Sequence, residues 1–85
     1  MPEISRFFGV VIAMFYSEHG VPHFHASYGD RRASIEVATG IVKGNLPPRV
    51  EGLVLEWRAL HGAELLENWQ NARSGRPLTP IPPLE

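Results

Sequence analysis

An 85-residue chain has room for one domain, because a chain of this length buries only about two thirds of its unfolded surface in a single core. Hydrophobic residues at 44% and charged residues at 20% exclude a disordered chain. The absence of cysteine excludes disulfides and thiolate metal sites, and a formal net charge of -1 gives no overall attraction for nucleic acid.

The first predicted element is a buried strand at residues 9–16, where the sequence reads GVVIAMFY. Valine, isoleucine and aromatic residues follow one another without alternation, which is typical of a central strand covered on both faces. The apolar run is too short to span a bilayer, so we expect no membrane partner. The absence of cysteine fits a reducing compartment, so we expect a cytoplasmic location. Residues 17–22 then have the glycine and proline of a turn or loop.

Residues 23–28 and 31–38 are predicted to form a hairpin, since two strand-like runs are separated only by Gly29 and Asp30. A two-residue loop sets the register of the whole hairpin. It places Tyr28 opposite Arg31 and, further down, His23 opposite Glu36. The remaining predicted pairs are Ser27 with Arg32, Ala26 with Ala33, His25 with Ser34, and Phe24 with Ile35.

This register separates the hairpin into an apolar face and a polar face, as strands with one buried side require. The predicted core side contains Phe24, Ala26, Ala33, Ile35 and Val37. The predicted polar side contains His23, His25, Ser27, Arg32, Ser34 and Glu36.

The second half of the chain predicts helices. Residues 41–46 extend the preceding strand past a bulge or form a fourth short strand, and the sequence leaves both open. Helices are predicted at about residues 48–61 and 63–73, with a break near His61 and Gly62, because the later apolar residues lie far around the helix from the earlier ones. The alternative is one long helix whose second half packs against another molecule.

The chain is predicted to end in an extended proline-rich strap at residues 77–85. The expected architecture is therefore α+β: a three- or four-stranded, mainly antiparallel sheet followed by one or two C-terminal helices packed on one face.

The histidines are the strongest chemical signal in the sequence. His23 and His25 project from the same face of one strand, with α carbons about 7 Å apart, so that both rings can converge on one ion or one phosphate. His19, in the preceding loop, is a third nitrogen ligand within reach. Glu36, opposite His23, would orient an imidazole or bind metal directly. His61 lies at the helix break, where we expect a packing or capping role.

Three interpretations of the polar face stay open. Histidine and carboxylate ligands suit zinc or a similar divalent ion, with His19, His23 and His25 as its ligands. Without metal, His23 and His25 with Glu36 would be the catalytic residues of acid–base chemistry on a phosphodiester. In this second interpretation, the ligand-binding residues are Arg31, Arg32 and Ser34. In the third interpretation, the polar face is an ordinary solvated surface.

Several segments resemble the small bacterial proteins classed as domain of unknown function 4160. The resemblance lies in the opening MPEISRFFGVVIAMFY, in HGVPHFHASYGD, and in the helical LVLEWRALHGAELLENWQNARSGRPLTPI. Its most specific parts are Pro22 to His25 and Glu67 to Trp69.

The resemblance implies a bacterial or phage-borne protein that is often encoded beside another short protein, an arrangement similar to a toxin–antitoxin module. We therefore expect a small module whose histidine face binds or cleaves a phosphate-bearing ligand such as RNA. The alternatives are a non-enzymatic module that binds protein through its helices or sheet edge, and a zinc-type hydrolase or sensor. Expected partners are a co-encoded small protein, RNA and a second copy of the chain.

Overall fold

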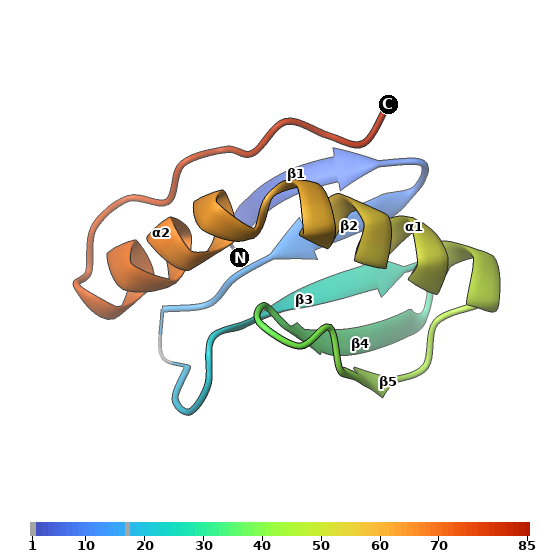
Figure 1. Ribbon diagram of the computed structural model, residues 1–85, viewed down its shortest axis with the longest axis horizontal. Coiled ribbons are helices and arrows are strands. Elements are labelled where there is room, and N and C mark those ends of the chain that lie inside the picture. The colour runs from blue at the N-terminus through green and yellow to red at the C-terminus, as the bar shows by residue number, and fades with distance from the viewer. Residues whose placement is uncertain (1, 17) are drawn as a thin grey trace.

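The computed structural model describes residues 2–16 and 18–85. In the described chain, one antiparallel sheet is followed by two helices that pack on one of its faces, the inner face (Figure 1). The sheet is five-stranded, with strands in the order β1-β2-β3-β4-β5. The elements are β1 (Glu3–Phe7), β2 (Val10–Ala13), β3 (His23–Tyr28), β4 (Arg31–Glu36), β5 (Val42–Gly44), α1 (Pro48–Leu60) and α2 (Gly62–Arg73).

The N-terminal segment differs from the prediction of one strand at residues 9–16. It forms a hairpin of β1 and β2, with Phe7 paired to Val10 across a two-residue turn. Phe8 and Gly9 both have positive φ, 47° and 81°, as a type I′ hairpin turn requires. The sheet therefore has one strand before Gly9 that the sequence did not indicate, and β2 ends at Ala13 instead of residue 16.

The register of the β3–β4 hairpin is confirmed, from Tyr28 opposite Arg31 to His23 opposite Glu36. The segment that the sequence left undecided forms a separate short strand, β5, which pairs with β4. With β1, it raises the number of strands to five, against the predicted three or four.

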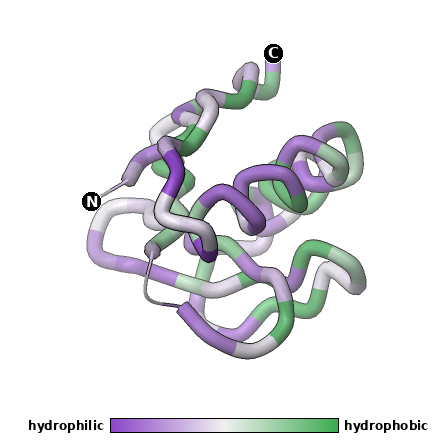
Figure 2. Tube along the Cα trace, turned by 90° about the vertical axis from the view of Figure 1, so that its left-hand side faces the viewer, coloured by the Kyte–Doolittle hydropathy of each residue, from purple (hydrophilic) through white to green (hydrophobic). Residues whose placement is uncertain are grey.

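The predicted break between the helices is confirmed. At His61 the backbone leaves the helical region, with φ -123° and ψ 26°. The break reorients the apolar residues of α2 relative to those of α1. Leu65 and Trp69 are therefore buried in the same core as Val54 and Trp57. Hydrophilic and hydrophobic segments alternate along the chain in Figure 2, as expected of elements that each bury one face.

The C-terminal residues form an extended strap that lies along β1 (Figure 1). The backbone N–H of Ile81 donates to the carbonyl oxygen of Ile4 at 2.8 Å, and Ile81 is buried. Asn68 holds the strap to α2 through both backbone polar groups of Thr79. The strap covers β1, one of the two edge strands of the sheet, and leaves β5 as the other edge.

None of the helices in residues 2–16 and 18–85 combines the length and the apolar character needed to cross a membrane.

Candidate functional site

The face of the sheet opposite the helices, here called the outer face, has the polar side chains that the register predicted. Along β3, Phe24 and Ala26 are fully buried on the inner face, whereas His25 and Ser27 are only partly buried. Neighbouring strands continue the same row: His25 pairs with Ala13 on β2 and with Ser34 on β4. The row ends at Lys43 of β5, which pairs with Ser34.

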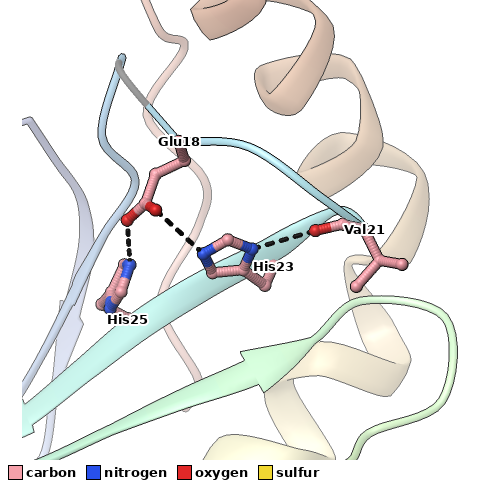
Figure 3. A network of polar contacts seen from close by, with 4 residues as sticks. All are labelled: Glu18, Val21, His23 and His25. Atoms are coloured by element: carbon pink, nitrogen blue, oxygen red, sulfur yellow. Dashed lines mark hydrogen bonds and ion pairs between the residues drawn. The ribbon is translucent and has the colours of Figure 1, made fainter.

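Both strand histidines converge on a carboxylate from the preceding loop, that of Glu18 (Figure 3). Glu18 Oε1 lies 2.5 Å from Nε2 of His25, and Oε2 lies 3.3 Å from Nε2 of His23. One ligand atom from each of the three residues lies within 4.8 Å of the others. We call Glu18, His23 and His25 the Glu–His cluster.

The orientation of His23 is determined by the backbone. Its Nδ1 lies 2.9 Å from the carbonyl oxygen of Val21. Because a carbonyl only accepts hydrogen bonds, Nδ1 carries the proton and donates it. In the neutral ring, Nε2 then has a lone pair, and this lone pair faces the Glu18 carboxylate.

Aromatic packing holds the two rings in place. Phe15 lies edge-on to His25 with ring centroids 4.7 Å apart, and Trp69 of α2 lies against His23 at 5.1 Å. The side chains of Glu18, His23 and His25 are 27%, 17% and 31% exposed. The cluster is therefore accessible to solvent but supported on two sides.

The Glu18 carboxyl favours its ionised form. Burial on its own would raise the pKa of this group, but the hydrogen bond with His25 and the electrostatic attraction of His25 and His23 outweigh it. The net result is a pKa below the ordinary value of 4.5, so Glu18 has a negative charge at neutral pH.

The other predicted site residues lie around the cluster in different ways. Glu36 is opposite His23 as predicted, but its carboxylate accepts a hydrogen bond from Thr39 Oγ1 at 2.9 Å. In the described chain, the ion pairs of His23 and His25 are with Glu18. His19 lines a hollow next to His23 and is not part of the Glu–His cluster. Arg31 is exposed, one residue before Arg32.

Two shallow hollows adjoin the cluster on the outer face. One, of about 350 Å³, has His25, Arg32 and Lys43 in its lining. The other, of about 320 Å³, contains His19, His23 and Glu36. Ser34 and Lys43 line both, so the hollows share a wall.

Sequence reasoning missed Glu18, although the signal was present. Glu18 precedes His23 by five residues in a loop that contains Gly20 and Pro22, two residues that favour a turn. A carboxylate in a loop that turns back over a strand can reach the histidines of that strand as readily as a carboxylate on the neighbouring strand can.

Comparison with known proteins identifies the family. The model of Domain of unknown function (DUF4160) matches residues 9–70, which is most of the chain. The chain belongs to this family. No curated protein and no solved structure matches the chain. Every residue of the Glu–His cluster, together with the Trp69 that packs on it, lies in the part matched to DUF4160.

Proposed function

We propose that this member of the DUF4160 family binds a divalent metal ion through Glu18, His23 and His25. Imidazole nitrogen with carboxylate oxygen is a donor set that suits zinc and neighbouring transition metals. Three protein ligands leave at least one coordination position for water or a ligand, the arrangement of catalytic zinc sites and not of closed structural ones. The proposed role is therefore that of a metal-dependent hydrolase or sensor.

The observation that carries the proposal is the hydrogen bond from His23 Nδ1 to Val21. It leaves the Nε2 lone pair of the neutral ring facing a carboxylate at 3.3 Å, an unfavourable contact unless a cation or a second ring proton lies between them. Histidines that bind metal commonly donate their other ring N–H to a backbone carbonyl, which orients the ring. His23 has this arrangement.

The distances are close to those that a metal ion requires. Tetrahedral bonds of about 2.1 Å put neighbouring ligand atoms about 3.4 Å apart. The separation between His23 and Glu18 is 3.3 Å, and the three ligand atoms lie within 4.8 Å of one another. A metal ion would move the Glu18 and His25 atoms apart from 2.5 Å, a change that rotation of the partly exposed Glu18 side chain allows.

The same geometry gives less support to acid–base catalysis by both histidines. A general acid or base needs a ring nitrogen directed at the substrate. His23 Nδ1 is hydrogen-bonded to Val21, and Nε2 faces Glu18. Both ring nitrogens of His23 already have partners within the chain, so a metal ligand or an ion-pair partner is the role that fits this residue.

Zinc titration of metal-free protein tests the proposal. Wild type is expected to bind one zinc ion per chain and to melt at a higher temperature with zinc, because a ligand that binds only the folded state stabilises it. Glu18→Gln, His23→Ala and His25→Ala should each weaken zinc binding by at least the roughly 10–100-fold that loss of an outer-shell partner costs.

The matched control is His61→Ala. His61 Nδ1 lies 2.6 Å from Glu64 Oε1, so this variant also removes a histidine–glutamate contact, but far from the cluster in sequence. It should leave zinc affinity unchanged. Equal zinc affinity in wild type and in the cluster variants would contradict the proposal and leave Glu18 as an ion-pair partner of the two histidines.

The toxin–antitoxin role, the RNA ligand and the co-encoded partner stay predictions from the sequence. Expression in a bacterial host tests the first of them. If the histidine face is toxic, growth inhibition should disappear in the His23→Ala, His25→Ala double variant and persist in His61→Ala. Undiminished inhibition by a folded double variant would remove the histidine pair from that role.

A further inference from the structure

The larger hollow on the outer face begins at the Glu–His cluster and extends across β3, β4 and β5. Its volume is about 350 Å³, near the lower end of the range for small-ligand sites. Besides His25, its lining includes Phe15, Arg32, Ser34 and Lys43. A ligand in this hollow would contact His25 and lie beside the metal ion proposed above.

The hollow exists because short side chains lie side by side on the outer face. Ala13 and Ser34 are the direct cross-strand neighbours of His25, one on each side. Ser27, two residues after His25 on the same strand, also belongs to the lining. Directly opposed side chains in a sheet are about 4.5–5.5 Å apart, so this group of small residues leaves a depression between the longer ones.

The charge of the hollow is positive. Among the residues that the structure describes, its lining includes Arg32 and Lys43 but no carboxylate. Within residues 2–16 and 18–85, the ion pairs involve neither of these two side chains. The hydroxyls of Ser27 and Ser34 add hydrogen-bond donors. A guanidinium, an ammonium and hydroxyls around one depression suit the several oxygens of a phosphate group.

Gly44 brings Lys43 to this position. A Cβ at Gly44 would lie 2.5 Å from the carbonyl oxygen of Arg32 and 2.7 Å from Cα of Ala33, and its φ is +128°. Only glycine adopts this backbone at such a distance from β4 without strain. The close approach pairs Lys43 with Ser34, on the shared wall of the two hollows.

We infer that this hollow binds the phosphate of a phosphate ester between Arg32 and Lys43, next to His25. The apolar part of the ligand would contact Phe15. The inference rests on the proposed metal function, for which it names the ligand class: the metal ion and the two cationic side chains would bind oxygens of the same ester. The space accommodates about one nucleotide unit, supplied as a free mononucleotide or as part of a single-stranded nucleic acid.

Titrations of the full chain with inorganic phosphate, adenosine 5′-monophosphate and a short single-stranded oligoribonucleotide, each with and without zinc, test the inference. Arg32→Gln and Lys43→Gln should each weaken binding at least about tenfold, because each removes a charge-assisted contact. Both residues are exposed, so these variants should stay folded. The matched control is Arg31→Gln, which removes the same charge from the neighbouring exposed residue outside the hollow and should change affinity less than about twofold.

Zinc should raise the affinity for phosphate, and phosphate should raise the affinity for zinc by the same factor, because linkage between two binding sites is reciprocal. Tighter binding of the oligoribonucleotide than of the mononucleotide would identify nucleic acid as the source of the phosphate. Equal affinities would identify a small phosphate ester. Either result supports the inference.

Failure of the inference and failure of the metal proposal give different results. If zinc binds but no phosphate ligand does, or if Arg31→Gln weakens phosphate binding as much as Arg32→Gln, the hollow is not a phosphate site. If phosphate binds through Arg32 and Lys43 while zinc does not bind, the inference holds and the metal function is overturned.

Discussion

The inner and outer faces of the sheet are built from the same strands but have different tasks. On the inner face, Phe24 and Ile35 are cross-strand partners with no exposed surface. On the outer face, one residue along, His25 and Ser34 are also partners, and both line an open hollow. Successive side chains along a strand point to opposite faces of the sheet, so the same strands pack the core on one face and present polar side chains on the other.

This separation has an energetic consequence. Inner-face side chains are closely packed, so a truncation there costs both transfer free energy and a cavity. Outer-face side chains are partly solvated, and changes to them usually alter the free energy of unfolding by about 0.5 kcal/mol or less. Stability should therefore depend on the inner face, and binding on the outer face.

The largest expected effect is that of Trp57→Ala. Trp57 is fully buried, its ring lies 5.5 Å from Phe7 and 5.6 Å from Phe24, and Nε1 donates to the carbonyl oxygen of Pro82. Its truncation should cost about 3–5 kcal/mol, measured by urea denaturation. His25→Ala, on the outer face, should cost less than about 1 kcal/mol. If His25→Ala proved as destabilising as Trp57→Ala, the comparison between the faces would fail.

Asn68→Ala should have the next largest effect. Asn68 is 1% exposed, and its amide both donates to Thr79 O at 2.8 Å and accepts from Thr79 N at 2.7 Å. Removing the amide takes two hydrogen bonds from the backbone of the strap, and because Thr79 is exposed and water can replace part of them, the total cost should be about 1–3 kcal/mol. The control is Thr79→Ala, which keeps both backbone groups and should be close to neutral. A destabilised Thr79→Ala would show that the strap is held in another way.

Gly44→Ala should cost about 1–3 kcal/mol, because alanine at a φ of +128° is strained and its Cβ would meet the Arg32 carbonyl. It should also weaken phosphate binding, since β5 must move and Lys43 with it. Gly52→Ala is the control: nothing lies within 4 Å of a Cβ there, in α1, so alanine should stabilise the helix by about 0.5–1 kcal/mol. Unaltered phosphate affinity in Gly44→Ala would separate β5 from the hollow.

The sequence predicted the β3–β4 hairpin pair by pair, because its information is local. The two-residue loop and the alternation of apolar and polar residues specify one register, and that register is observed. The β1–β2 hairpin has no such signal. Its turn places Phe8 at a φ of 47°, a conformation that bulky residues rarely adopt, so the sequence reads as one apolar run.

The candidate site was predicted in part, for the same physical reason. That His23 and His25 share a face follows from the period of one strand. The contact with Glu18 depends on how a loop turns back over that strand, and the support from Trp69 depends on how α2 packs. Such contacts are set by tertiary structure, and strand periodicity does not encode them.

The smallest expected effect concerns how the free energy of unfolding of the metal-free protein falls at acidic pH. The pKa of Glu18 is lowered in the folded chain, so the folded state binds fewer protons than the unfolded state near pH 4.5. The stabilisation is therefore complete above about pH 4.5, the ordinary carboxyl pKa, and is lost as the pH falls through the lower folded value. Glu18→Gln should flatten this part of the stability curve, measured by urea denaturation at successive pH values with a chelator present.

Glu3→Gln separates this effect from that of an ordinary surface pair. The hydrogen bond from Arg6 lowers the pKa of Glu3, partial loss of hydration opposes this, and the attraction of the Arg6 charge adds to the lowering. The pair is fully exposed, so salt should screen most of its contribution. The partly buried Glu18 contribution should persist at high salt. If high salt abolished the contributions of Glu3 and Glu18 equally, the Glu–His cluster would behave like an ordinary surface ion pair. Only the hollow would then distinguish the outer face from ordinary surface.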